Sequence, residues 1–149
     1  MTDYLNLIYK KVEDAIQYIY HYKAQYPDAG NLALVFDIDG TLMNDEKPIQ
    51  PVVDLYNIGK SLGFHIFIIT ARDTNGVAET IAQLDKIGVS EYESMYFRLP
   101  IYWDMNEYKE KSRKSITDKG YHVVLSIGDT AWDIGRYGGY GVLLPQLVF

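Results

Sequence analysis

The apolar residues of the chain fall into two alternating kinds of segment. Short runs that are apolar almost throughout, such as Leu-Ala-Leu-Val-Phe at 32–36 and His-Ile-Phe-Ile-Ile at 65–69, are typical of strands buried on both faces. A third run, at 121–127, has the same character. We therefore predict strands over these three segments and shorter strands near 96–99 and 141–144.

Between and before these runs, apolar residues recur at three- and four-residue spacing, which predicts amphipathic helices. The clearest case opens the chain, where the repeating apolar positions are Leu5, Ile8, Val12, Ala15, Ile16 and Ile19. Each predicted helix is followed closely by a proline or a glycine, which ends it. The helices are expected over residues 3–26, 51–62, about 75–87 and 106–119.

Strands that are nearly all apolar and that alternate with helices predict a parallel sheet with helices on both faces. No linker, repeat or low-complexity tract divides the sequence. We therefore expect one doubly wound α/β domain over residues 1–149, with residues 1–26 as a leading amphipathic helix. In such sheets ligands bind beyond the carboxyl ends of the strands, so the residues that follow each strand are the candidates for function.

Composition and charge exclude several kinds of function for this chain. A chain of 149 residues with 48% hydrophobic and 23% charged residues is typical of a globular domain. The net charge of -6 and the lack of a basic stretch argue against general nucleic-acid binding. The sequence has no Cys, which excludes disulfides and cysteine-based sites, and no apolar segment is long enough to span a membrane. Residues 1–17 place charges among their apolar positions, so we expect no secretory signal and a cytoplasmic location.

Acidic residues follow two of the predicted strands. Asp37 and Asp39 come directly after the run at 32–36, in the motif D-I-D-G-T, and carboxylates this close repel each other unless a cation lies between them. Asp129 and Asp133 follow the run at 121–127, in the motif G-D-T-A-W-D, and Thr70 ends the run at 65–69. Because the carboxyl ends of parallel strands share one edge of the sheet, we expect these side chains to lie close together.

A lysine near the start of the helix at 106–119 would add a positive charge to this cluster. The segment contains three candidates, Lys109, Lys111 and Lys114. A helix that precedes a parallel strand begins at the carboxyl edge of the sheet, so its earliest lysine lies nearest to the aspartates. We therefore select Lys109 and expect the other two lysines to be solvated.

Taken in this order, the motifs resemble those of the haloacid dehalogenase-like (HAD) superfamily of aspartate-dependent phosphatases. Its signature is DxDGT, then a Thr or Ser, then a Lys, then a GDxxxD-type acidic motif. The resemblance spans residues 32–145 and implies a Rossmann-like core. The sequence is most similar to the acid phosphatase-like branch, which also has a long leading helix, a Y-K-x-x-x-R-K segment (here 108–114) and Leu-Pro after the acidic motif (here 144–145). It departs from that branch at Gly40, where Glu is usual.

The resemblance implies a Mg²⁺-dependent phosphomonoester hydrolase in which Asp37 attacks phosphorus and forms an aspartyl-phosphate. The carboxylates of Asp37 and Asp129 and the backbone carbonyl of Asp39 would be the oxygen ligands of the metal. The side chain of Asp39 would protonate the leaving oxygen and then activate the attacking water. The remaining roles are phosphate binding by Thr70, Lys109 and the backbone turn at Gly40, and support of the metal shell or the lysine by Asp133.

The segments that follow the first two predicted strands are too short for a large cap domain, so we expect an open site. Its phosphorylated substrate is either a small monoester or a macromolecule, such as a phosphorylated nucleic-acid end or a phosphoprotein. A phospho-receiver domain is disfavoured because its lysine would follow the last core strand, whereas Lys109 precedes Asp129. A dehalogenase would have no need of Asp39, and the intact acidic positions argue against a non-catalytic binding descendant.

The aromatic stretch at 96–103 leads into the helix that carries the lysines. It can be interpreted as a stacking wall for a base or as a buried strand and loop, and we expect the second. Within it, Arg98 is either a phosphate contact or part of a surface salt bridge, and again we expect the second.

Overall fold

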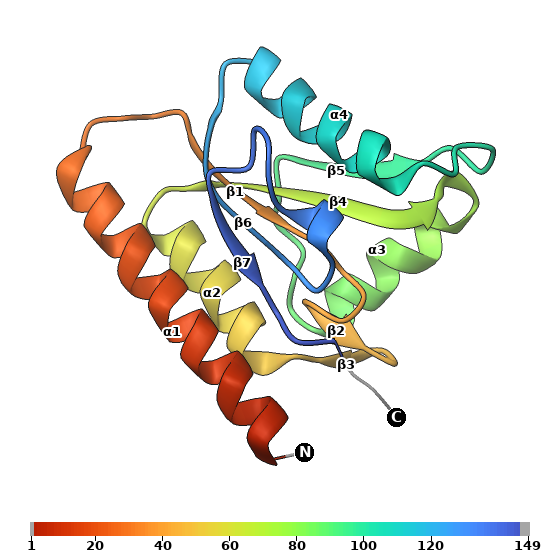
Figure 1. Cartoon of the computed structure of the whole chain (residues 1–149), viewed down its shortest axis with the longest axis horizontal. Helices are drawn as coiled ribbons and strands as arrows, with labels where there is room; N and C mark the ends of the chain where they lie inside the picture. The colour runs from red at the N-terminus through yellow and green to blue at the C-terminus, as the bar shows by residue number, and fades with distance from the viewer. Residues whose placement is uncertain (1, 147–149) are drawn as a thin grey trace.

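In the computed structural model, which describes residues 2–146, five strands form one sheet in the order β5-β4-β1-β6-β7 (Figure 1). Every neighbouring pair is parallel. The strands are β1 (Leu32–Phe36), β4 (His65–Asp73), β5 (Ser94–Arg98), β6 (His122–Gly128) and β7 (Tyr140–Leu143). The predicted parallel α/β sheet is therefore confirmed, with the apolar run at 32–36 as its fully buried central strand.

Helices cover both faces of the sheet. The helices α1 (Thr2–Gln25), α2 (Gln50–Ser61) and α3 (Val77–Lys86) lie on one face, and α4 (Met105–Asp118) lies on the other (Figure 1). Two 3-10 turns, η1 (Thr74–Gly76) and η2 (Ala131–Asp133), follow β4 and β6. Each of the four predicted helices is present, with ends that differ by only a few residues from the expected ones.

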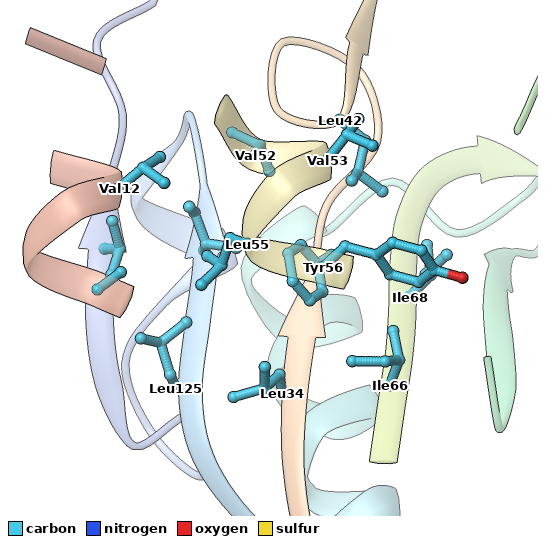
Figure 2. Close-up of a cluster of buried hydrophobic side chains, with 14 of the residues drawn as sticks. Val12, Leu34, Leu42, Val52, Val53, Leu55, Tyr56, Ile66, Ile68 and Leu125 are labelled. Carbon is cyan, nitrogen blue, oxygen red and sulfur yellow. The ribbon is translucent and has the colours of Figure 1, made fainter. Parts of the chain in front are cut away.

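The core is divided between the two faces by the two-residue repeat of the strands. Leu34 of β1 and Ile68 of β4 pack toward α1 and α2, whereas Val35 and Phe67 pack toward α4. Figure 2 shows the larger cluster, in which Tyr56 of α2 lies over the strands. Its members labelled there are Val12, Leu34, Leu42, Val52, Val53, Leu55, Tyr56, Ile66, Ile68 and Leu125.

The strand predicted at 65–69 is longer than expected. β4 continues through residues 70–73. Thr70 therefore lies inside the strand, and the expectation that it ends the strand is wrong. Residues 71–73 are half-buried, and the strand pairs with β5 through Asp73 and Arg98, after a register shift between Ile69 and Asp73. Polar residues can continue a strand at the rim of a sheet because one side of the strand there meets solvent, and an apolar run does not reveal that.

A small antiparallel hairpin, formed by β2 (Met43–Asn44) and β3 (Lys47–Pro48), was not predicted. It follows the D-I-D-G-T motif and leads into α2. Asp45 and Glu46 form its turn, and both have positive φ angles, of 49° and 63°. Within residues 2–146 this hairpin is the only element between β1 and α2, and η1 alone separates β4 from α3, so neither connection carries a large cap.

No helix within residues 2–146 combines the length and the apolar character that crossing a membrane requires.

Candidate active site

Three carboxylates meet at the carboxyl edge of the sheet. Asp37 follows β1 directly and is held there by its own N–H, which donates to the carbonyl of Ile127 at 3.1 Å. Asp129 follows β6, and Asp133 lies in η2. One carboxylate oxygen from each of the three aspartates lies within 4.8 Å of the others. The structure thus brings the two expected metal-binding carboxylates together and adds Asp133 to them.

Two glycines leave room for these carboxylates. Gly40 has a φ of +76°, and a Cβ atom built on it would lie well inside van der Waals contact of the Asp129 carboxylate. A Cβ atom on Gly128 would overlap the side chain of Asp133 in the same way. Asp129 and Asp133 therefore pack against bare backbone, and Gly40 is required here by its close approach to Asp129 as well as by its φ angle.

Lys109 is buried among the acidic side chains, with 1% of its surface exposed. Its Nζ lies 3.0 Å from Oδ1 of Asp37, 2.6 Å from Oδ1 of Asp133 and 2.7 Å from the carbonyl oxygen of Ile69. Burial lowers the pKa of Lys109, but the charges of Asp37 and Asp133 outweigh that effect and raise it above its ordinary value. The ammonium group therefore stays charged and links α4 to the ends of β1 and η2.

The other two candidate lysines lie away from the cluster. Lys111 pairs with Glu107 at 2.7 Å, and Lys114 pairs with Asp118 at 2.8 Å. Both are exposed pairs of residues four apart on α4, which is the usual arrangement on a solvated helix face.

The cluster carries more negative charge than Lys109 neutralises. Burial raises the pKa of Asp37 to about 8, against the opposing charge of Lys109 and with further increases from Asp133 and Asp129. Burial also raises the pKa of Asp129. Oδ2 of Asp37 accepts a hydrogen bond from the hydroxyl of Thr41 at 3.2 Å. Because this donor is neutral, it does not offset the repulsion between Asp37 and the other carboxylates. A set of hard oxygen donors with excess negative charge fits a divalent cation.

Thr70 and its neighbours line the β4 side of the cluster. Thr70 is fully buried, and its hydroxyl accepts a hydrogen bond from the N–H of Arg72 at 3.1 Å. Its carbonyl accepts from the hydroxyl of Tyr108 at 2.6 Å, and the preceding carbonyl, of Ile69, accepts from Lys109. These bonds tie the first turns of α4 to β4, and they fix the position of Lys109 relative to Thr70.

Asp39 is placed differently from the other aspartates. Its side chain is 61% exposed and is not one of the three carboxylates that meet beside Lys109. Both of its oxygens accept hydrogen bonds from Arg72, at 2.9 Å from Nε and 2.7 Å from Nη2. Sequence reasoning missed Arg72, although a signal was present: it follows Thr70 by two residues, so both side chains point to the same side of one strand.

The η2 turn that holds Asp133 is fixed from two sides. Oδ2 of Asp133 accepts hydrogen bonds from the N–H and the hydroxyl of Thr130, at 3.1 and 2.8 Å. The buried guanidinium of Arg113 donates to the carbonyls of Trp132 and Arg136, at 2.7 and 2.8 Å. Next to this turn lies a cavity of about 610 Å³, lined by Asp129, Thr130, Ala131, Trp132, Leu143, Leu144 and Gln146.

The expectations for the stretch at 96–103 are partly wrong. Arg98 is only 9% exposed, so it is not part of a surface salt bridge. Its guanidinium donates instead to four carbonyls, those of Ala71, Leu99, Pro100 and Tyr102, at 3.0 to 3.3 Å. The loop that these bonds fix is not buried, because Leu99, Ile101 and Trp103 are 57%, 85% and 76% exposed.

Comparisons with known proteins agree with this geometry. The sequence model of the HAD superfamily subfamily IIIB acid phosphatases matches residues 43–140, which include Thr70, Lys109, Asp129 and Asp133. The crystal structure of a class C acid phosphatase from Bacillus anthracis with tungstate bound is similar in fold, with a TM-score of 0.79 over 97% of this chain and 78% of that chain. At 16% sequence identity, this likeness shows the fold alone. No curated protein matches the sequence.

The family match covers well over half of the chain and contains the ends of β4 and β6, the lysine helix and the acidic turn of the site, whereas Asp37 and Asp39 lie before its first residue. The parallel sheet without a large cap agrees with it. The chain therefore belongs to the HAD superfamily, subfamily IIIB, the acid phosphatases, and is a phosphomonoester hydrolase that acts on phosphorylated substrates.

Proposed function

We propose that the chain hydrolyses phosphomonoesters with the help of Mg²⁺, through an aspartyl-phosphate formed on Asp37. The observation that carries this proposal is the position of Asp37, buried at the end of β1, in contact with Lys109 and close to the carboxylates of Asp129 and Asp133. A carboxylate at such a place is accessible to a phosphoryl group only along the open edge of the sheet. It can divide the hydrolysis into two easier steps.

The proposed metal ligands are the carboxylates of Asp37 and Asp129 and the backbone carbonyl of Asp39. Their donors are all oxygens, as Mg²⁺ prefers, and the burial and neighbouring carboxylates that raise the pKa of Asp37 and of Asp129 support the binding of an additional positive charge. When bound, the cation would neutralise charge on the phosphoryl oxygens and on the carboxylates. Asp133 would hold Lys109 through its 2.6 Å ion pair and so serve the site indirectly.

In the first step, an oxygen of Asp37 forms a bond to phosphorus while the bond from phosphorus to the leaving oxygen breaks. The carboxylic acid of Asp39 gives its proton to that leaving oxygen. In the second step, the Asp39 carboxylate takes a proton from water, the water oxygen attacks phosphorus, and the bond to Asp37 breaks. Phosphate leaves and both aspartates return to their starting state, while Thr70, Lys109 and the backbone at Gly40 position the phosphoryl oxygens.

The open edge also bears on the kind of substrate. Because no large cap closes over the cluster within residues 2–146, a bulky leaving group can extend into solvent. We therefore include phosphorylated oligonucleotide ends and phosphopeptides beside nucleotides and sugar phosphates as candidate substrates.

The proposal is tested by substituting Asp37 with Asn, which keeps the shape and removes the attacking charge. We expect hydrolysis of every substrate by Asp37→Asn to fall to background while the protein stays folded. The matched control is Asp118→Asn, the same chemical change at a carboxylate that is exposed on α4. Activity should also vanish in chelator and return with Mg²⁺. Near-normal turnover by Asp37→Asn, or full activity in chelator, would contradict the mechanism.

A further inference from the structure

The guanidinium of Arg72 holds the carboxylate of Asp39 in a two-pronged contact. Nε lies 2.9 Å from Oδ2 and Nη2 lies 2.7 Å from Oδ1, so two parallel charge-assisted hydrogen bonds join two planar groups. The side chain of Asp39 is 61% exposed, which means that surrounding packing does little to fix it. Its orientation is therefore determined mainly by Arg72.

Arg72 is itself anchored on the side away from Asp39. Its Nη1 donates to Oγ1 of Thr80 at 3.2 Å and to Oε1 of Gln83 at 2.6 Å, and both partners belong to α3. Thr80 is 1% exposed, so this end of the contact is rigid. A continuous path of hydrogen bonds thus runs from α3 through Arg72 to the D-I-D-G-T motif.

The contact keeps the Asp39 carboxylate apart from the other acidic groups. Asp37, Asp129 and Asp133 meet within 4.8 Å, whereas the side chain of Asp39 turns toward β4 and α3. Without this contact, the Asp39 carboxylate would be free to turn and bind the cation proposed at Asp37. If it bound the cation, it could no longer exchange a proton with the leaving oxygen.

We propose that Arg72 is a positioning residue: it orients the Asp39 side chain for proton transfer, releases one of the two oxygens when Asp39 carries the proton, and keeps the side chain out of the metal cluster. This inference rests on the acid/base role of Asp39 given under the proposed function. Arg72 does not touch the phosphoryl group in this role, so it affects catalytic steps that use Asp39 and leaves phosphate binding unchanged.

The test compares alkyl and activated aryl phosphates. An alkoxide leaving group needs a proton, and an activated phenolate hardly needs one. Arg72→Ala should therefore lower kcat for an alkyl phosphate by roughly 10²-fold, the lower range for loss of a general acid. The loss for the aryl phosphate should be several times smaller, and KM and inhibition by inorganic phosphate should stay nearly unchanged. Arg72→Lys should recover little, because an ammonium group cannot make the two-pronged contact.

A double variant separates positioning from other roles. In an Asp39→Asn background the positioned carboxylate is gone, so adding Arg72→Ala should cost little more than Asp39→Asn alone. Two independent, multiplying losses would overturn the proposal, as would equal losses on both ester types or weaker inhibition by phosphate. If Asp39→Asn itself keeps full kcat on alkyl phosphates, the acid/base assignment fails first, and that outcome is distinct from a failure of Arg72.

Two further variants guard against a folding artefact. Arg136→Ala removes an arginine whose side chain is 72% exposed, and it should change neither melting temperature nor ester preference. Gln83→Leu removes one anchor of Arg72 without touching Asp39, and it should give a milder form of the same leaving-group dependence. If Arg72→Ala does not fold, the result for Gln83→Leu decides. The inference would be overturned if Gln83→Leu lowered kcat by the same factor for the alkyl and the aryl phosphate, or lowered neither.

Discussion

At the scale of single residues, Gly40 shows how the site depends on an absent side chain. Gly40→Ala would push a methyl group into the Asp129 carboxylate, and we expect this to lower Mg²⁺ affinity by roughly 10–100-fold, as for other changes next to metal ligands. The control is Gly88→Ala, where φ is +84° but nothing lies within 4 Å, so only backbone strain is added. Affinity can be measured by calorimetric titration. Equal affinities for the two variants would show that the contact with Asp129 is unimportant.

The residues of the site differ in how well the sequence reveals them. Asp37 and Asp129 follow apolar runs, and parallel strands bring such ends together, so their meeting was predictable. The closeness of Lys109 to the aspartates follows from its place near the start of α4. The sequence did not reveal the roles of three arginines, Arg72, Arg98 and Arg113. Arg98 and Arg113 bind backbone carbonyls, and Arg72 binds a carboxylate that is distant along the chain. A pattern of residue types does not encode such pairings.

At the scale of elements, the β2–β3 hairpin offers a direct test of backbone strain. Asp45 and Glu46 both have positive φ angles, a conformation that Asp tolerates but that costs a residue such as Glu about 1–2 kcal/mol. Changing them to Asn-Gly, the preferred pair for such a two-residue turn, should raise the free energy of unfolding by about 1 kcal/mol, after the entropy cost of Gly. Urea denaturation measures it. An unchanged or lower stability would contradict this account of the turn.

The same hairpin is one of the elements that could not be predicted from the sequence. Each of its strands has two residues, too few to show an alternating pattern, and its turn lacks the glycine that would have marked it. The long apolar strands and the 3.6-residue periodicity of α1 were recognised because burial imposes a repeat over many residues. The extension of β4 to Asp73 has no such repeat, since its last residues are half-buried at the rim.

At the scale of the whole molecule, His65 links three segments at the edge of the sheet opposite the aspartates. Its Nδ1 lies 2.6 Å from a Glu93 oxygen and its Nε2 lies 2.8 Å from the carbonyl of Gly30. Both partners only accept hydrogen bonds, so both bonds form together only when each ring nitrogen carries a proton, in the charged imidazolium. The bond to Glu93 raises the pKa of His65 above 6.5, against an opposing effect of burial and with a further increase from Gly30.

Because the pKa of His65 is higher in the folded state, its charged form stabilises the folded protein. This contribution is fully present at pH values below the unfolded-state pKa of about 6.5. This contribution is lost as the pH rises through the higher folded pKa. We expect the difference in unfolding free energy between the wild type and His65→Gln to shrink between pH 6 and pH 8. Subtracting the variant removes titrations common to both proteins. The facing ring of Tyr121, and the Lys60–Glu91 pair that lines a surface pocket with His65, remain in both. A difference that stays constant with pH would refute the charged state.

The uncovered carboxyl edge of the sheet has a consequence for the kinetics of turnover. Since no large cap lies over the aspartates within residues 2–146, substrate entry and phosphate departure require no domain to swing aside. We therefore expect bond breaking, and not a conformational gate, to set the rate of turnover. With a slow alkyl phosphate, kcat should stay constant as sucrose raises the viscosity of the solvent. A decrease in proportion to viscosity would instead reveal a moving part that controls the cycle.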